Sequence, residues 1–329
     1  MRKNFIELKL YRFAACLCFI SQVVWLQMAC ANAETKDKDV VKENFRTQAH
    51  DGIKMSPNKT QKEKMKDFHG LHHNNLLLLP NAWDAISAKI FEQEGAQAIG
   101  TTSSGIAAAL GYPDGQRIPK DLFLKAVERI VSSVRVPVSI DLEAGYGQTV
   151  DEVCDTVQKV IHMGAVGINL EDTDPKTNQL IPLTQQVERI RAIRKLANEN
   201  DLPLFINART DVYWVSNIPP EKRYKETLQR LLAYKAAGAD GLFVPGLTDV
   251  PLITKLCRET QLPLNILGGI WITSLDILKN AGVSRISIGS GIFRAATTYT
   301  QHAYRQFMRD DFSFLKDSIS YDFINNLYK

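Results

Sequence analysis

Short apolar runs alternate with longer amphipathic stretches along most of the chain. The apolar runs are rich in β-branched residues and have the length of buried strands. They occupy residues 76–80, 96–103, 136–142, 165–171, 202–208, 240–246, 262–268 and 285–290. The stretches between them have helical spacing, and several end at a glycine, as helices commonly do. The pattern predicts a parallel α/β domain of eight strands, each followed by a helical stretch.

Eight strand–helix units favour a closed barrel. Residues 58–329 fit the usual size of a (β/α)₈ domain. No Gly-x-Gly-x-x-Gly motif follows the first strand, as a dinucleotide-binding open sheet would require. The sequence therefore predicts a TIM-type barrel over residues 58–329, including C-terminal helices. An open doubly wound sheet is the alternative that this alternation allows.

Residues 1–57 differ in character from the rest of the chain. A basic opening precedes an almost uncharged apolar run over residues 13–31, and residues 31–33 offer the small side chains that a signal peptidase reads. We expect residues 1–33 to be a signal peptide, so that the protein is exported, periplasmic or secreted, and free of the membrane after cleavage. An uncleaved anchor is the alternative, because the run is about long enough to span a bilayer. Residues 34–57 are charged and poor in aromatics, which predicts a flexible linker.

Composition and charge narrow the function classes. The chain has 329 residues, of which 45% are hydrophobic, so it can bury a large core. The formal net charge is +4, and much of the basic excess precedes residue 70. We therefore expect no nucleic-acid partner for the folded part.

Acidic side chains follow several predicted strands. Asp141 and Glu143 come at the end of the third strand, and Glu171 at the end of the fourth. Asp114 lies in the loop after the second. In this fold the carboxyl ends of the strands converge on one mouth, where acids repel one another unless a cation lies between them. Hard oxygen ligands of this kind suit Mg²⁺ or Mn²⁺, so we expect Asp141, Glu143 and Glu171 to hold the metal.

Spacing and neighbours refine the interpretation of these acids. Asp141 and Glu143 are two positions apart on one predicted strand, so we expect them to face the same way. Asp84 and Asp172 also follow predicted strands. For those two, a helix N-cap or an ion pair with a nearby base is a fair alternative.

The fifth strand ends in Asn207, Arg209 and Asp211. A guanidinium presents a planar fork to a carboxylate or phosphate, so a substrate acid between Arg209 and the metal would be fixed at two points. An ion pair of Arg209 with Asp211 or Glu171 is the alternative. The turn at residues 103–105 and the glycines after strands seven and eight could offer backbone N–H groups to another anionic oxygen, although tight turns also explain those glycines.

Five separated stretches carry a resemblance to one family. They read LPNAWDAISAKIFEQEGAQAIGTTSSGIAAALGYPDG, SIDLEAGYG, GINLEDTDP, INARTDVY and ISIGSGIFRAA. With these motifs in this order, the chain resembles the isocitrate lyase and phosphoenolpyruvate mutase superfamily, and most closely its phosphoenolpyruvate phosphonomutase-like branch. The resemblance implies a magnesium-dependent barrel that makes or breaks a C–C or P–C bond in a small 2-oxo or 2-hydroxy acid, through an enolate.

The resemblance also implies roles for individual residues. Asp141 matches the direct metal ligand, and the other three acids match those that hold the metal's waters. Ser104 and Gly105 match a turn whose backbone binds substrate oxygens, and Arg209 matches the substrate-binding arginine. We expect the substrate to be bound by Ser103, Ser104, Gly105, Asp114, Asn207 and Arg209. We expect catalysis to involve Arg209, Asp114 and Glu171.

Two departures from the family pattern stand out. Glu143 occupies a position where the family often has aspartate. The lyases of the family carry a Lys-Lys/Arg-Cys-Gly-His loop after the fourth strand, whereas this chain reads EDTDPKTNQLIPLTQQ there, without the catalytic cysteine. Cleavage of isocitrate or methylisocitrate by the cysteine route is therefore not expected. The shorter loop at residues 172–182 would close over the substrate and exclude water.

These observations lead to ranked functions. We expect a magnesium-dependent lyase or decarboxylase of oxaloacetate-decarboxylase type, with phosphoenolpyruvate or phosphonopyruvate mutase or hydrolase chemistry second. An exported, non-catalytic protein that binds a carboxylate ligand or a protein partner is the alternative from another class. The resemblance also implies a homodimer or homotetramer that exchanges its C-terminal helix. Packing of that helix on its own barrel is the alternative.

Overall fold

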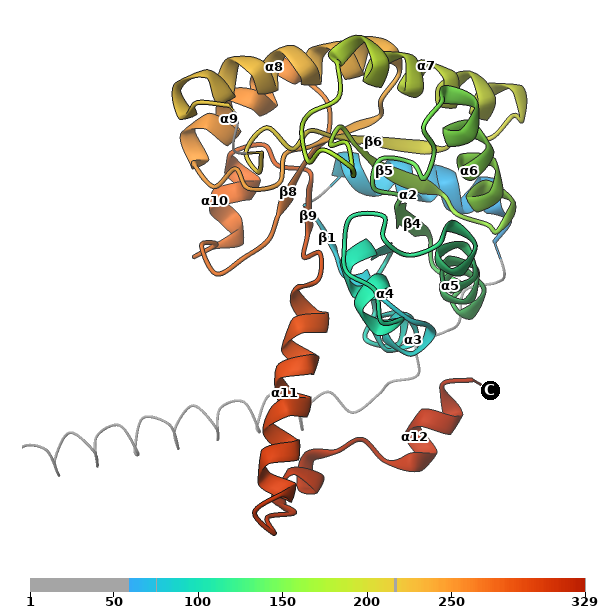
Figure 1. Ribbon diagram of the computed structural model, residues 1–329, viewed down its shortest axis with the longest axis vertical. Helices are drawn as coiled ribbons and strands as arrows, with labels where there is room; N and C mark the ends of the chain where they lie inside the picture. Colours follow the sequence, from blue (N-terminus) through green and yellow to red (C-terminus); the bar gives the residue numbers. More distant parts are fainter. Residues whose placement is uncertain (1–58, 75, 216–217, 329) are drawn as a thin grey trace, which may run out of the picture. The chain divides into compact units, whose positions relative to one another are not determined.

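The computed structural model describes residues 59–74, 76–215 and 218–328 (Figure 1). The expected signal peptide at 1–33 and linker at 34–57 lie outside the described residues. Within the described ranges, none of the helices combines the length and apolar character needed to span a bilayer.

Parallel strands form a nearly closed barrel, as predicted, rather than an open sheet. Their order is β1-β9-β8-β7-β6-β5-β4-β3-β2. The strands are β1 (Leu77–Leu79), β2 (Asn81–Ala82), β3 (Ile99–Thr101), β4 (Val138–Asp141), β5 (Gly167–Glu171), β6 (Phe205–Arg209), β7 (Gly241–Phe243), β8 (Leu264–Leu267) and β9 (Arg285–Ser287). Each predicted strand is present, and the first is divided in two.

The division of the first strand follows from Pro80. Proline has no N–H to donate to a ladder, so β1 ends before it and β2 begins after it. β1 pairs with β9 and β2 pairs with β3, so the two halves join the ends of the sheet. Buried Asn81 holds this junction: its Nδ2 donates to the carbonyl of Thr101 at 2.8 Å, and its Oδ1 accepts from the N–H groups of Ile288 and Gly289 at 2.8 and 2.9 Å. A side chain therefore replaces part of the missing ladder.

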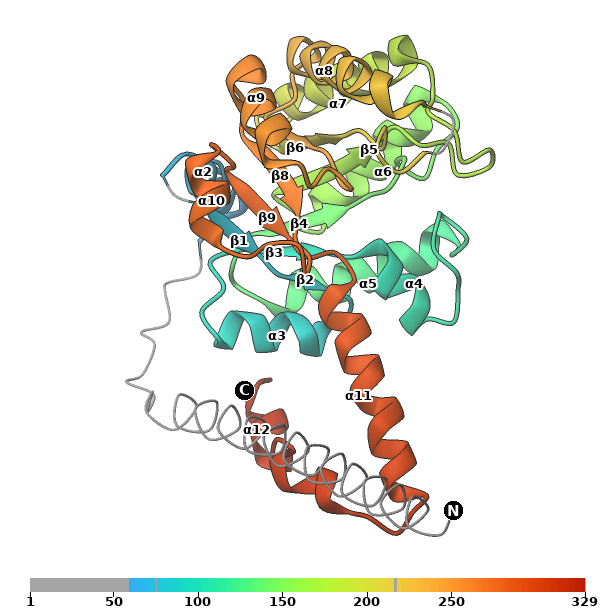
Figure 2. The same ribbon diagram turned by 90° about the vertical axis from the view of Figure 1, so that its left-hand side faces the viewer.

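Helices α2 to α10 surround the barrel, whereas α11 and α12 lie away from it (Figures 1 and 2). The surrounding helices are α2 (Gln61–Asn74), α3 (Ala85–Gln93), α4 (Ser103–Ala109), α5 (Lys120–Ser133), α6 (Val150–His162), α7 (Leu183–Glu199), α8 (Pro220–Ala237), α9 (Val250–Thr260) and α10 (Leu275–Asn280). The C-terminal segment contains α11 (Gly291–Phe307), the 3₁₀ helix η1 (Ser313–Asp317) and α12 (Tyr321–Asn326). Asp84 caps α3 through a 2.8 Å bond from the N–H of Ser87, so the N-cap alternative for Asp84 is confirmed.

The two faces of the sheet have different characters. Residues that face the helices are apolar and buried, such as Ile140, Ile168 and Ile206. The interior of the barrel is polar by comparison. Its buried side chains include Asn169, Asn207, Asn265, Arg285 and Ser287. Such groups need hydrogen-bond partners, so they fix a defined network below the mouth.

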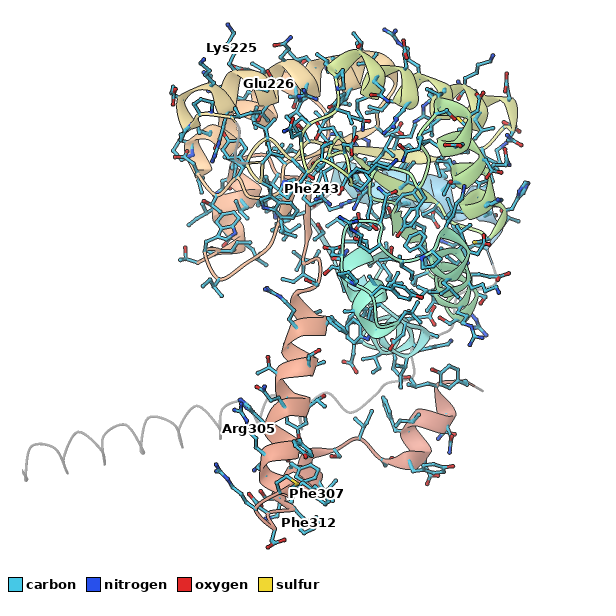
Figure 3. All side chains as sticks on the ribbon, in the orientation of Figure 1. Lys225, Glu226, Phe243, Arg305, Phe307 and Phe312 are labelled. Atoms are coloured by element: carbon cyan, nitrogen blue, oxygen red, sulfur yellow. The ribbon has the colours of Figure 1, made fainter. Side chains whose placement is uncertain are left out.

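Helix α11 leaves the barrel instead of packing against it. Both ribbon views show α11 projecting from the end of β9 (Figures 1 and 2). The side chains of Arg305 and Phe307 lie on α11, and that of Phe312 lies on the segment that follows it (Figure 3). None of its residues is buried. Leu78, on the helix-facing side of β1, is 51% exposed, although its register partner Ile286 is buried. The outer face of the barrel beside β1 therefore lacks a covering helix in the single chain.

Candidate active site

A cavity of about 1350 Å³ opens at the carboxyl ends of the strands. Seven of the nine predicted site residues line it: Ser103, Ser104, Asp114, Asp141, Glu143, Glu171 and Arg209. Phe243, at the end of β7, contributes an apolar wall (Figure 3). The structure thus brings together residues from β4, β5 and β6 and from the loop after β3, as a site at this end of the barrel requires.

Asp141 is the last residue of β4 and is held at both carboxylate oxygens. Its Oδ2 accepts hydrogen bonds from the N–H and the hydroxyl of Ser103, at 3.2 and 2.8 Å. Its Oδ1 lies 3.5 Å from Nδ2 of Asn169 and 4.0 Å from Nη1 of Arg209. The carboxylate therefore has a defined orientation in the cavity wall.

Glu143 reaches the cavity by a different route from the one predicted. β4 ends at Asp141, and Glu143 lies beyond it in a turn, with a left-handed φ of 50°. Gly145 has a φ of 99°, and a Cβ there would lie 2.7 Å from Val153. At Gly147 a Cβ would lie 2.6 Å from the N atom of Val153, so the turn requires both glycines where it packs under α6. The two acids converge through that turn and not through the alternation of a strand.

The buried carboxyl of Glu143 accepts two hydrogen bonds. The hydroxyl of Tyr146 donates to Oε1 and the N–H of Gln116 donates to Oε2, both at 2.8 Å. Burial raises the pKa of Glu143 to about 7, and repulsion from Asp141 and Asp114 adds to this, while the bonds from Tyr146 and Gln116 oppose it. The energy of ionising Glu143 is therefore high unless a cation is near.

Arg209 lies at the centre of the charged groups. Its Nε and Nη2 donate to the two oxygens of Asp211, at 2.6 and 3.0 Å, and its Nη1 lies 2.8 Å from Glu171. Trp214 lies against its guanidinium, with 4.7 Å between Cζ and the ring centroid. Both ion pairs given as the alternative for Arg209 are thus present, although Arg209 also lines the cavity.

The pKa values of the central pair reflect burial and mutual charge. Burial raises the pKa of Glu171, Asp211 and Asp141 add to that by repulsion, and the charge of Arg209 opposes it. For Arg209 itself, burial acts against the charge, but Asp211, Glu171 and Asp141 outweigh it and raise the pKa. Arg209 is therefore a permanent cation whose charge three acids share.

Two cavity residues that contact Arg209 are not among the predicted site residues. The sequence indicates Asp211 only as an ion-pair partner, and it does not indicate Trp214. Asp211 also accepts a 2.9 Å bond from the hydroxyl of Thr173, so it links β6 to the loop after β5. The signal that could have identified Asp211 is its position two residues after Arg209, just beyond the end of β6.

Two predicted substrate-binding residues, Gly105 and Asn207, do not line the cavity, and their part in substrate binding stays a prediction. The N–H of Gly105 donates to Oγ1 of Thr102 and helps to cap α4, and a Cβ there would lie 2.9 Å from Cβ of Trp83. Asn207 is 1% exposed and donates through Nδ2 to Oδ1 of Asn169, deeper in the barrel. Both residues therefore support the site without reaching its space.

Asp172 anchors the wall beside the site. This buried carboxylate accepts from the hydroxyl of Tyr234 at 2.6 Å and from Nη1 of Arg230 at 3.2 Å. It also accepts from the N–H of Asp211 at 2.9 Å and the hydroxyl of Thr210 at 2.7 Å. The ion-pair alternative for Asp172 is thus confirmed, and Asp172 fixes the backbone of the segment that carries Arg209.

The short loop after β5 folds over one side of the mouth. An antiparallel bridge joins Thr173 to Leu180 at its base. Asn178 and Pro175 line the cavity, whereas the Nζ of Lys176 donates to Gln148 at 3.2 Å on the surface. Among the polar residues of this loop tip, Asn178 is therefore the one placed to meet a substrate.

The donor set fits a magnesium ion that keeps several of its waters. Within the described part of the chain, no three acidic, histidine or cysteine side chains lie close enough to hold an ion by themselves. Asp141, Glu143, Glu171 and Asp114 nevertheless line one cavity with oxygen donors only. Mg²⁺ commonly binds through one or two carboxylates and retained water. Such an ion would offset the burial, and the lesser repulsion from Asp141 and Asp114, that raise the pKa of Glu143.

The pKa of Glu143 predicts a pH-dependent metal affinity. An acid with a pKa of about 7 is mostly protonated at pH 6 and mostly ionised at pH 8. Because the metal and its waters favour the ionised form, the apparent Mn²⁺ affinity should rise about tenfold between these pH values. Titration calorimetry at both pH values measures this. The Glu143→Gln variant should bind more weakly and lose most of the pH dependence; an equally steep dependence in this variant would contradict the assignment.

Comparisons with known proteins agree with this geometry. Residues 68–308 match the family described as Phosphoenolpyruvate phosphomutase. The chain is 36% identical over 239 residues to the uncharacterized protein Rv1998c of Mycobacterium tuberculosis (strain ATCC 25618 / H37Rv), covering 72% of this chain and 87% of that one. It is 30% identical over 227 residues to an oxaloacetate decarboxylase of Rhodopseudomonas palustris (strain BisA53), a match that covers 66% of this chain and 75% of that one. A crystal structure from Burkholderia cenocepacia J2315, with a provisional phosphonomutase assignment, is 40% identical with a TM-score of 0.72 and covers 74% of this chain and 100% of that one.

Proposed function

Because this chain belongs to the isocitrate lyase/phosphoenolpyruvate mutase superfamily, whose enzymes are lyases and phosphonomutases, we propose that it cleaves a C–C bond in a small 2-oxo or 2-hydroxy acid. The proposed reaction is of oxaloacetate-decarboxylase type and depends on Mg²⁺ or Mn²⁺. The observation that carries it is the convergence of Asp141, Glu143 and Glu171 in one cavity with Arg209.

The residues have separable tasks in this reaction. The metal, when bound, would stabilise negative charge on the enolate oxygen. Asp141 would hold the ion directly, and Glu143 and Glu171 would hold its waters. Arg209 would bind the substrate carboxylate through N–H groups that Asp211 and Glu171 leave free, while Asp211 keeps the guanidinium in place. In decarboxylation of oxaloacetate the C3–C4 bond breaks, CO₂ leaves, and the electron pair forms the enolate that is protonated to pyruvate.

The cavity also suits a substrate with an anionic group at each end. Arg117 and Arg294 line it in addition to Arg209, and both are exposed. Neither has an ion-pair partner among the described residues. Arg117 or Arg294 could therefore bind a second carboxylate in the same cavity. Phosphonopyruvate also has two anionic ends, which supports phosphoenolpyruvate or phosphonopyruvate mutase or hydrolase chemistry as the second candidate, together with the similarity to the Burkholderia structure.

A substrate panel tests the proposed reaction. Purified protein with Mg²⁺ or Mn²⁺ should release pyruvate from oxaloacetate at least about tenfold faster than the same concentration of metal alone. Turnover of phosphonopyruvate but not of oxaloacetate would favour the second candidate. Binding of these acids without turnover of any of them would favour the exported, non-catalytic carboxylate-binding or interaction protein.

Export rests on residues 1–33 and remains part of the proposal. A periplasmic or secreted protein should begin at Glu34 after cleavage, so the mass of the protein recovered from its native cells tests this directly. A mass that includes residues 1–33 would instead favour an uncleaved membrane anchor.

The proposed homodimer or homotetramer is supported by the projecting helix. α11 and the segment after it expose large apolar side chains, including Tyr304, Met308 and Phe312, each more than half exposed. The barrel leaves Leu78 uncovered. Exchange of α11 between two copies would cover both surfaces at once, which a single chain does not do.

Light scattering after gel filtration tests this assembly. The protein should have at least twice the mass of its 37.0 kDa chain, or of the chain without residues 1–33 if these are removed. Leu78→Lys should weaken association by about tenfold or more, because it places a charge against an apolar partner. Leu232→Lys, a matched change at an exposed leucine of α8, should leave the mass unchanged. A wild-type monomer would contradict the proposal.

A further inference from the structure

Arg285 is an unusual side chain for the interior of a barrel. It begins β9 beside Leu77 of β1 and Asn265 of β8, and it is 1% exposed. Its guanidinium reaches the strand β5, where Nη2 donates to Oδ1 of Asn169 at 2.7 Å. Its Nε and Nη1 have no hydrogen-bond partner among the described residues. A buried cation with two unpaired nitrogens is costly, and packing alone does not require it.

The contact of Arg285 fixes which way the Asn169 amide points. Oδ1 of Asn169 accepts from Arg285 and also from Nδ2 of Asn207, at 2.7 and 2.8 Å. A flipped amide would direct its NH₂ group at both of these donors, so the flipped state is excluded. The Nδ2 of Asn169 must therefore face the other way, where Oδ1 of Asp141 lies 3.5 Å from it.

The amide of Asn169 in turn limits how the Asp141 carboxylate can rotate. Ser103 donates two hydrogen bonds to Oδ2, and Nδ2 of Asn169 lies against Oδ1, so both oxygens have a partner that opposes rotation of the carboxylate. The nearest competing cation is Arg209, whose Nη1 is 4.0 Å from Oδ1. Without Asn169, the carboxylate could turn onto this guanidinium and pair with it. A carboxylate held by Arg209 would be a weaker ligand for a metal.

We infer that Arg285 and Asn169 are positioning residues that hold Asp141 ready for the metal and away from Arg209. This inference rests on the proposed metal-dependent function. Burial lowers the pKa of Arg285 to about 9, with the charge of Asp141 opposing that shift, so Arg285 stays charged at neutral pH. Partners of this kind outside the ligands themselves typically change metal affinity by about 10- to 100-fold.

A double-mutant cycle on Mn²⁺ binding tests the relay. Electron paramagnetic resonance gives the Mn²⁺ dissociation constant without any turnover. Asn169→Leu should weaken binding about 10- to 100-fold and Arg285→Met about tenfold. The double variant should bind no more weakly than Asn169→Leu alone, since Arg285 acts through Asn169. Fully additive losses, or unchanged affinity in Arg285→Met, would overturn the inference.

Asn265→Leu provides the matched control. Asn265 is 1% exposed at the same level of the barrel, and its side chain bonds only to Ser287 among the described residues. The Mn²⁺ dissociation constant of the Asn265→Leu variant should stay within about twofold of that of the wild type. If Arg285→Met does not fold, Arg285→Lys keeps the charge and one donor nitrogen, so it should retain part of the Mn²⁺ affinity. An Mn²⁺ affinity as low as that of Asn169→Leu would count against the relay.

A crystal structure of metal-free Arg285→Met separates this inference from the proposed function. The Asp141 carboxylate should turn toward Arg209 in that variant, whether or not the protein is an oxo-acid lyase. An Asp141 side chain unchanged from the wild type would overturn the inference. Failure of the wild type to bind Mn²⁺ would instead contradict the proposed function. The metal-free crystal structure would still show whether the Asp141 carboxylate turns toward Arg209.

Discussion

Replacing Asp141 with asparagine should lower kcat/KM for the metal-dependent reaction about 10³-fold or more. The amide has nearly the shape of the carboxylate but lacks the charge that would hold a divalent cation. A loss of this size corresponds to about 4 kcal/mol of transition-state stabilisation, within the several kcal/mol that a metal can supply. Steady-state kinetics with Mg²⁺ and with Mn²⁺ measure the loss.

The free energy of unfolding should fall only modestly in the same variant. Oδ2 can still accept the two hydrogen bonds from Ser103 if the amide places its oxygen there, but the NH₂ group then replaces Oδ1 and faces Nδ2 of Asn169. The matched control is Asp121→Asn, at an exposed acid in the first turn of α5, which should keep full activity. Activity within threefold of the wild type in Asp141→Asn would refute the assignment of Asp141 as a ligand.

Replacing Arg209 with methionine should damage both stability and activity. The guanidinium is buried between Asp211 and Glu171, and its loss leaves two buried acids without their counter-charge. Removal of one partner from a buried ion pair typically costs about 3–5 kcal/mol. Urea unfolding of the variant and the wild type measures this difference. We expect kcat/KM to fall about 10³-fold as well, because the substrate acid would lose its charged partner.

A lysine at position 209 separates charge from geometry. Arg209→Lys keeps the cation but cannot donate to both oxygens of Asp211 and still reach Glu171. It should recover part of the stability and little of the activity. Arg129→Met, at an exposed arginine of α5, controls for the loss of a charge and should be neutral. A fully stable and active Arg209→Met would contradict the central place given to this side chain.

The barrel could be predicted because buried strands appear in the sequence as short apolar runs between amphipathic stretches. The eight runs correspond to the eight strand positions of the barrel. Only the break in the first strand was not predicted, although Pro80, which causes it, is visible in the sequence. The departure of α11 could not be derived from the residues, because an amphipathic helix has the same pattern whether it packs on its own barrel or on another copy.

The sequence predicts most of the residues that line the cavity but few of the contacts between them. Alternation correctly places Asn207 and Arg209 on one face of β6, but it does not say how deep each lies, and only Arg209 reaches the cavity. The alternation rule also does not predict the turn at Glu143, because β4 ends at Asp141 and Glu143 has a left-handed φ. Long-range partners such as Arg285 and Asn169 are 116 positions apart, and no local pattern joins them.

Anomalous diffraction from crystals grown with Mn²⁺ and oxalate, a mimic of the enolate, tests most directly whether Asp141 binds a divalent cation beside Arg209 at the mouth of the barrel. We expect one strong peak within coordinate-bond distance of the Asp141 carboxylate, with Glu143 and Glu171 reaching it through water. No peak in the cavity at saturating Mn²⁺, or a peak that Asp141 does not contact, would contradict it.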